Sequence, residues 1–271
     1  LLASPAAGKF DAITTNGAQF AVDVTQTQVN QAEANPEGSK PSVLYENPRW
    51  LSNGTIALNN LSNENRLALY SPSATGNRMQ VVTANFGAAQ PSAPPAAVGE
   101  SLAFGLDNGQ LVIIDPTNGA HVASPFQPPV EPGRKHKWNQ PVYLEEAHAL
   151  YATDSRRKLY RIAVAETLRA LTEIDVEGTI LGPLATVGKQ VAAVLSDQTA
   201  ETLLVLDGTT LSKVASTALD GRWQAGPFAL NADSVVVQTD RKLQAFGVGR
   251  HLLGEVLRRA APAPWPRSGA A

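Results

Sequence analysis

Few residues in this 271-residue chain have the type and spacing that catalysis or metal binding requires. The four histidines, His121, His136, His148 and His251, lie far apart, and no two have the spacing of metal ligands on one element. We interpret them as surface or strand-face residues. The chain has no cysteine, which excludes disulfides, thiolate metal sites and a cysteine nucleophile. No nucleophile elbow, phosphate loop or calcium loop occurs. We therefore predict no catalytic residue, no cofactor and no metal.

Carboxylates that could act as acids, bases or ligands have simpler roles in turns. Glu145 and Glu146 follow an apolar segment where a turn is expected, so we favour a solvated turn over an acid–base pair. Asp115 and Asp207 each follow an apolar run, where an aspartate caps a turn by accepting hydrogen bonds from backbone amides. A metal-binding role for these two is the less favoured alternative.

One basic and aromatic segment could instead contact a partner. The sequence EPGRKHKWNQP occupies residues 131–141, and a second Arg–Trp pair follows at residues 222–223. Exposed Trp and Arg are enriched at protein contacts. We predict that both segments lie on one face, with Arg49 and Trp50 nearby. The predicted partner-binding residues are Arg134, Lys135, His136, Trp138, Arg222 and Trp223. The alternative is that each Trp packs between neighbouring sheets and that the basic residues are simply solvated.

The elements that must position these residues are short strands that recur along the chain. Each strand is a similar apolar run, such as LVIID at residues 111–115, and turn residues follow it. We use the first large apolar residue of each run as an anchor. The anchors are Phe20, Leu67, Leu111, Leu159, Leu203 and Leu243. Successive anchors lie 40–48 residues apart, which indicates an internal repeat.

A proline precedes five of the anchors at a similar distance and supports the repeat. These prolines are Pro48, Pro95, Pro141, Pro183 and Pro227. A further apolar segment lies between each proline and its anchor, and a more polar one follows the anchor, so each unit reads as four strands. A β-sandwich also has closely spaced strands, but consecutive four-stranded units without helical spacers are typical of a β-propeller. We predict an all-β chain, a β-propeller of about six four-stranded blades.

The ends of the chain depart from the repeat. We assign residues 1–249 to the repeats and residues 250–271 to a basic tail rich in Ala and Pro. The first unit lacks its own first strand, and residues 24–47 form a mobile inserted loop in this interpretation. Either the tail completes the first blade and closes a six-bladed ring, or the chain is a piece of a larger propeller. A helix over residues 251–259 is a further alternative.

The pattern G-x-L-x-x-x-D-x-x-x-G at residues 109–119, with echoes at 203–214 and 67–76, resembles the repeat of quinoprotein-like propellers, the pyrroloquinoline-quinone-like repeat family. Dehydrogenases of that family hold a quinone with a stacked tryptophan, calcium, vicinal cysteines and an aspartate base. This chain has no cysteine, and Ala120, His121 and Val122 follow the repeat glycine where the family has a tryptophan. The chain is more similar to the branch that has lost the cofactor and acts as a periplasmic scaffold.

The resemblance implies a non-enzymatic interaction or scaffold module that binds other proteins through one propeller face. We expect a monomer in the periplasm or another extracytoplasmic compartment. A truncated quinone-dependent dehydrogenase and a carbohydrate-binding propeller remain the alternatives. The net charge of −2 provides no general attraction for nucleic acid, so we predict no nucleic-acid partner. The sequence has no run of eighteen apolar residues, so we predict no membrane insertion.

Overall fold

The computed structural model describes residues 2–3, 9–13, 19–23, 28–33, 46–59, 65–71, 78–129, 136–154, 156–197 and 199–248. In these residues the chain forms strands that pair antiparallel with their neighbours in sequence, and one short 3₁₀ turn, η1 (Glu145–Ala147). None of the helical structure described is long enough or apolar enough to cross a bilayer. The all-β prediction is confirmed.

The strands form six successive sheets. The first three sheets comprise β1 (Leu2–Ala3), β2 (Lys9–Ile13), β3 (Gln19–Asp23) and β4 (Gln28–Glu33); β5 (Glu46–Trp50), β6 (Ile56–Asn59), β7 (Arg66–Ser71) and β8 (Arg78–Thr83); and β9 (Ala96–Val98), β10 (Ser101–Gly105) and β11 (Leu111–Ile114). The last three comprise β12 (Val142–Leu144), β13 (Ala149–Thr153), β14 (Lys158–Ala163) and β15 (Arg169–Asp175); β16 (Thr179–Val187), β17 (Gln190–Ser196), β18 (Glu201–Asp207) and β19 (Lys213–Ala218); and β20 (Trp223–Asn231), β21 (Ser234–Thr239) and β22 (Leu243–Gly247).

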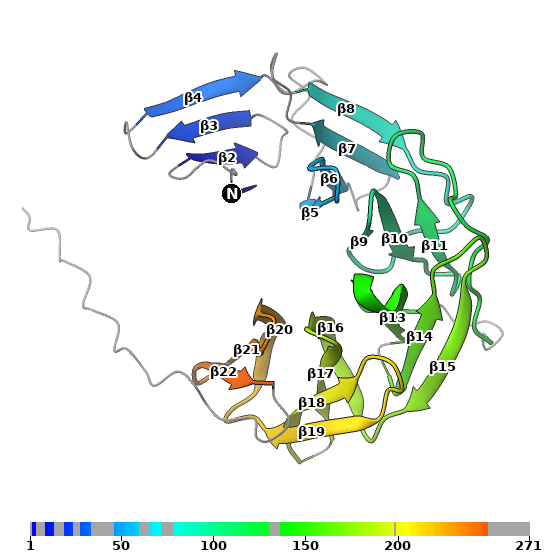
Figure 1. The fold of residues 1–271 in the computed structure, drawn as a ribbon, viewed down its shortest axis with the longest axis vertical. Coiled ribbons are helices and arrows are strands. Elements are labelled where there is room, and N and C mark those ends of the chain that lie inside the picture. The colour runs from blue at the N-terminus through cyan, green and yellow to red at the C-terminus, as the bar shows by residue number, and fades with distance from the viewer. Residues whose placement is uncertain are drawn as a thin grey trace, which may run out of the picture.

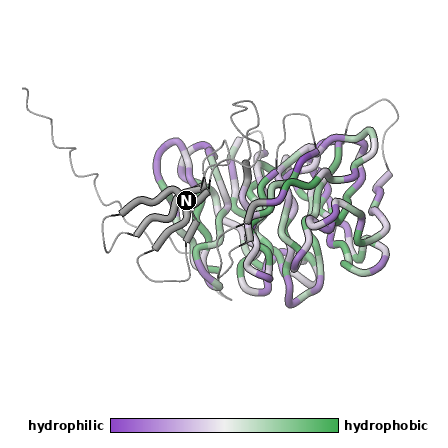
Figure 2. Tube along the Cα trace, turned by 90° about the horizontal axis from the view of Figure 1, so that it is seen from above, coloured by the Kyte–Doolittle hydropathy of each residue, from purple (hydrophilic) through white to green (hydrophobic). Residues whose placement is uncertain are grey.

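The sheets follow one another around a common centre (Figure 1). The first strands of the sheets, such as β5, β16 and β20, lie toward the centre, and the last strands, such as β8, β15 and β19, lie on the outside. An open interval separates the sixth sheet from the first. Seen from the side, apolar residues fill the middle of the disc and hydrophilic residues gather in the loops at its two rims (Figure 2). This arrangement is that of a propeller.

Every repeat anchor lies in the third strand of its sheet. Phe20 is in β3, Leu111 in β11 and Leu243 in β22, and the other three anchors lie in β7, β14 and β18. The third strand β11 is apolar along its length because neighbouring sheets cover both of its faces, and all four of its residues are buried. The outer strands β15 and β19 are mostly exposed, as their polar sequences predict.

The five repeat prolines lie in or just before the first strands of sheets two to six. Pro48, Pro183 and Pro227 fall where the pairing between the first and second strands shifts register. Pro95 and Pro141 immediately precede β9 and β12. Proline has no amide hydrogen to donate, so it is tolerated at an irregularity of an edge strand but not in a continuous ladder. These prolines therefore mark the inner edges of sheets two to six.

Core clusters fill the space between successive sheets from the second to the sixth. Phe104 and Leu69 belong to the cluster between sheets two and three, and Leu206 belongs to the cluster between sheets four and five. Two further clusters lie between sheets three and four and between sheets five and six. The faces of each sheet are thus shielded from water only where neighbouring sheets pack on them. Repeat architectures gain much of their stability from such contacts between neighbouring units.

Three sequence expectations about the sheets need correction. The first unit does have a first strand, because Leu2 pairs with Asp11 and Ala3 with Phe10. The expected inserted loop at residues 24–47 is wrong at residues 28–33, which form β4, the fourth strand of the first sheet. In the described residues, sheets three and six have three strands instead of four. In sheet three, isolated bridges from Phe126 and His121 to β11 stand where a fourth strand was expected.

The tail at residues 250–271, the expected helix at residues 251–259 and His251 lie outside the described residues. The boundary at residue 249 and the two modes of ring closure stay predictions.

Candidate partner-binding site

The predicted rim segments lie in the connections that lead into the first strands of sheets four and six. His136 and Trp138 precede β12, and Arg222 and Trp223 stand at the start of β20. Arg134 and Lys135 lie outside the described residues. Trp50 does not share this rim, because it ends β5 and pairs with Ile56 across the following turn. Trp138 and Trp223 stand where the chain enters a first strand, whereas Trp50 stands where the chain leaves one. The turn after β5 is therefore at the opposite rim, and the expected proximity of Trp50 to the other two tryptophans is wrong.

Trp138 is completely buried, so the expectation that its ring is exposed is also wrong. The indole packs edge-on against Tyr160, with ring centroids 5.8 Å apart. Gly105, the last residue of β10, lies against it: a Cβ at that position would be 2.5 Å from the Trp138 Cβ. The Trp138 amide donates to Ser92 Oγ at 3.1 Å. The alternative interpretation, in which this tryptophan packs between sheets, is the one observed.

Trp223 also packs between two sheets, here sheets five and six, but its side chain is only half-buried. Its Nε1 donates to the Gly226 carbonyl at 2.9 Å, and its backbone amide donates to Glu201. Its ring covers Gly182, whose φ of +63° favours glycine and where a Cβ would be 2.3 Å from Trp223 Cζ2. Arg222 beside it is exposed.

His136 adds little charge to this rim. Burial lowers the pKa of its imidazole, while the neighbouring Asp154 carboxylate acts in the opposite direction. The ring is therefore neutral at pH 7. Its centroid lies 4.4 Å from that of Trp138. Of the four predicted residues that the structure describes, Arg222 is exposed, His136 and Trp223 are half-buried and Trp138 is buried. The role of all six predicted residues in partner binding stays a prediction.

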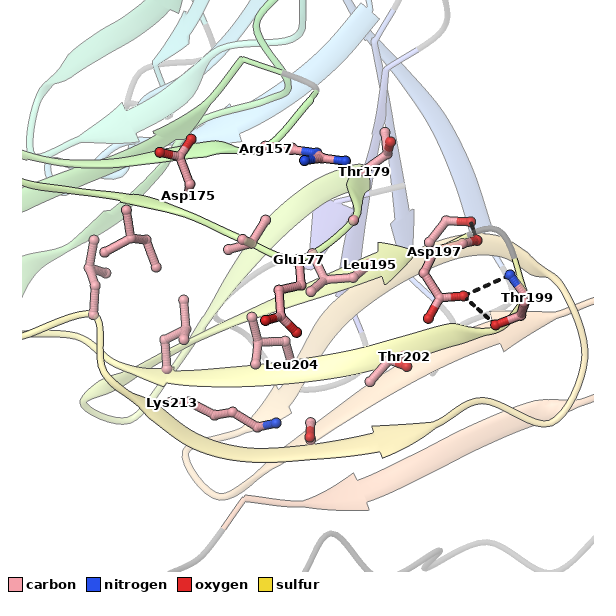
Figure 3. A pocket seen from close by; sticks show the side chains of 17 residues that line it. Arg157, Asp175, Glu177, Thr179, Leu195, Asp197, Thr199, Thr202, Leu204 and Lys213 are labelled. Atoms are coloured by element: carbon pink, nitrogen blue, oxygen red, sulfur yellow. Dashed lines mark hydrogen bonds between the residues drawn. The ribbon is translucent and has the colours of Figure 1, made fainter.

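The structure brings together a different set of residues in an open groove of about 1320 Å³ between sheets four and five. The end of β15 and residues 176–178 form one wall, and β18 and β19 form the other (Figure 3). Arg157, Asp175 and Thr179 lie along the first wall, Lys213 lies on the second, and Glu177 projects toward Leu204 between them. The groove lies at the perimeter of the propeller.

The floor of the groove is apolar because it is the outer edge of the core between the two sheets. Leu204 and Leu206 belong to that core, as do Leu195 and Val176. Thr202, Leu204 and Leu206 occupy alternate positions of β18 and therefore point to the same side. Their regular spacing of about 6.6 Å matches the spacing of alternate side chains in an extended peptide.

Polar groups surround this floor. Lys158 in β14 forms ion pairs with Glu173 at 3.1 Å and with Asp175 at 3.5 Å on β15, and of these three residues Asp175 lines the groove. At the end of the groove Asp197 accepts hydrogen bonds from the Thr199 amide and hydroxyl at 2.7 and 2.8 Å, which hold the pKa of its carboxyl below its usual range. Exposed Glu177 and Lys213 stand on opposite walls. The groove can therefore receive a chain that carries apolar and charged side chains.

The sequence did not reveal this groove, because its residues come from two repeat units. The run at residues 203–206 looked like buried core, which it largely is. A usable signal was present in the polar outer strands: Lys213 and Ser216 mark the side of β19 that borders the groove.

The other candidate residues have the turn roles predicted for them. Asp115 accepts from the Thr117 amide at 2.8 Å, and Asp207 accepts from the Thr209 and Thr210 amides at 2.9 and 2.8 Å. Glu145 and Glu146 lie exposed in η1. His121 and His148 are exposed. Across the described part of the chain, no three His, Asp or Glu side chains form a group that could hold a metal ion.

Comparisons with known proteins bear on the fold. No protein-family model and no curated protein matches the sequence. The fold is similar to the crystal structure of BamB from Moraxella catarrhalis, with 14% identity and a TM-score of 0.53 over 92% of this chain and 72% of that one. A chain in the crystal structure of the Mitotic Checkpoint Complex is 8% identical, with a TM-score of 0.61 over 90% of this chain and 77% of that one.

The computationally designed Ika8 protein is 10% identical, with a TM-score of 0.58 over 90% of this chain and 70% of that one. At such identities the likeness concerns the fold alone. Together with the six successive sheets around one centre, it shows that this chain is a β-propeller.

Proposed function

We propose that the protein is a non-enzymatic interaction scaffold that holds an extended segment of another protein in the groove between sheets four and five. One similar chain belongs to the Mitotic Checkpoint Complex, and the repeat pattern at residues 109–119 resembles that of the scaffold branch of quinoprotein-like propellers. These likenesses support an interaction role without naming a partner.

The observation that carries the proposal is the construction of the groove. Its floor of leucine and valine side chains reaches the protein surface. A partner that covers these apolar side chains would remove them from water. An extended segment is the occupant that fits, because alternate residues of β18 present their side chains at the spacing of a strand. Glu177 on one wall and Lys213 on the other favour a segment that carries both a basic and an acidic side chain.

The composition of the lining argues against a carbohydrate ligand in this groove. Sugar recognition relies on aromatic rings that stack on the sugar, and the residues around the groove are aliphatic, hydroxyl-bearing or charged. The five lining residues with hydroxyl groups suit hydrogen bonds to a peptide backbone equally well; they are Thr179, Ser196, Thr199, Thr202 and Ser216.

A selection from a phage-displayed library of random dodecapeptides tests the proposal. Selected peptides should bind the wild-type propeller, and Thr202→Arg should weaken that binding by about tenfold or more, because the long side chain fills the groove above Leu204. Thr209→Arg provides the matched control, since Thr209 is exposed in the turn between β18 and β19 and does not line the groove. Equal binding by wild type and both variants would contradict the proposal.

A further inference from the structure

The outer edge of sheet five is open along one half of its last strand. β19 pairs through its inner edge with β18, and the Leu219 amide donates to the Glu201 carbonyl at the end of that ladder. Hydrogen-bonded and non-hydrogen-bonded pairs alternate along an antiparallel ladder. Thr217 therefore bonds inward, and the amides and carbonyls of Ser216 and Ala218 point outward, where the described residues provide no further strand.

This edge lacks the features that usually protect an outer strand. Protection comes from charged side chains, prolines or bulges. β19 has a lysine at its start, Lys213, and a register shift next to it, but Ala215–Ala218 carries only small uncharged side chains. The corresponding strand of sheet four, β15, carries Arg169, Glu173 and Asp175 along its length. The two outer strands that flank the groove thus differ, and β19 is the open one.

The open edge and the groove are continuous. Ser216 lines the groove and is also one of the residues whose amide points outward. A strand added beside β19 would continue the face formed by Leu204 and Ser216, so every second side chain would point into the groove. Those side chains would meet Ile174 and Glu177 on the opposite wall.

We propose that the partner segment binds as a fifth strand of sheet five, through backbone hydrogen bonds to Ser216 and Ala218. This inference rests on the proposed function and specifies the partner: an extended segment with alternating apolar residues and one lysine or arginine directed toward Glu177. Backbone pairing supplies affinity, and the alternate side chains supply selectivity.

Two variants of the same residue test the strand geometry. Ser216→Pro removes the outward amide and leaves the inner ladder intact, since proline is tolerated on an edge strand when its nitrogen faces outward. Ser216→Ala removes the hydroxyl and keeps the amide. We expect Ser216→Pro to weaken binding of a library-selected peptide by about tenfold, the loss of one hydrogen bond, and Ser216→Ala to bind within about twofold of wild type.

A second measurement uses the peptide, so it does not depend on the folding of the proline variant. N-methylation at successive positions of the selected peptide should abolish binding at alternate residues, whose amides bond to β19, and be tolerated at the residues between. Uniform tolerance, or wild-type binding by a folded Ser216→Pro variant, would overturn the strand geometry. If Thr202→Arg still weakens binding in that case, the groove proposal survives; a library without any binder would overturn both.

Discussion

Trp138 and Gly105 form a buried contact across two sheets, in which the indole occupies the space that a side chain at Gly105 would need. The tryptophan comes from the connection into sheet four and the glycine from the end of β10 in sheet three. This contact is part of the core cluster between the two sheets. It explains why an aromatic residue in a basic, polar segment is structural.

Gly105→Ala should destabilise the fold by about 1–3 kcal/mol, because the added methyl group meets the Trp138 Cβ at 2.5 Å. Trp138→Ala should cost about 3–5 kcal/mol through the cavity that it leaves. Urea denaturation measures both. Gly247→Ala is the matched control, since a Cβ there meets nothing within 4 Å. Unchanged stability of Trp138→Ala would show that the ring is not core.

The hydroxyl of Tyr151 in β13 donates to the Gly208 carbonyl in sheet five and links the two sheets that border the groove. Both residues are buried, so Tyr151→Phe leaves the carbonyl without its partner and should lower the free energy of unfolding by about 1–3 kcal/mol. Tyr143→Phe serves as a control, since that tyrosine is only half-buried and should change stability by less than about 0.5 kcal/mol. Equal effects of the two substitutions would argue against the link.

Three aspartates in turns should make the fold sensitive to acid. Hydrogen bonds from Lys242 and Arg241 lower the pKa of Asp220, and the Thr210 and Thr199 amides do the same for Asp207 and Asp197. Each folded-state pKa lies below the unfolded value of about 3.9. Their contribution to stability is therefore complete above that value and is lost as the pH falls through the folded-state pKa.

We expect the free energy of unfolding to be nearly constant between about pH 5 and 7 and to fall below about pH 4. Asp220→Asn, which removes the charge that pairs with Arg241 at 2.9 Å, should reduce the steepness of that fall. Urea titrations at a series of pH values measure it. A variant with the same acid dependence as wild type would assign the transition to other carboxylates.

Addition of pyrroloquinoline quinone with calcium separates the scaffold from the dehydrogenase alternative. We expect no saturable change in quinone absorbance and no shift in Tm, because the chain has no cysteine and lacks the tryptophan after Gly119 that the family's enzymes use. Saturable binding would reverse the assignment in favour of an enzyme.

The repeat could be predicted from the sequence because each unit repeats the same short local patterns. An anchor such as Leu159 starts an apolar run whose burial on both faces requires a strand, and a proline such as Pro183 marks an inner edge where a missing amide does no harm. The burial of Trp138 could not be predicted from such local patterns. It depends on Gly105, which is in the preceding sheet and leaves room for the ring.

The groove was unpredictable for a related reason. Leu204 belongs to a run that any method would assign to the core, and Glu177 belongs to a short polar connection. Only the packing of sheet four on sheet five places the two beside each other.

Hydrogen–deuterium exchange of the whole chain, with and without a library-selected peptide, tests the central claim most directly. The proposal predicts slower exchange in β18, in β19 and at residues 174–179 when the peptide is bound, with no change at residues 136–141 and 219–223. Protection confined to those two rim segments would place the partner on the propeller face and contradict the groove as the binding site.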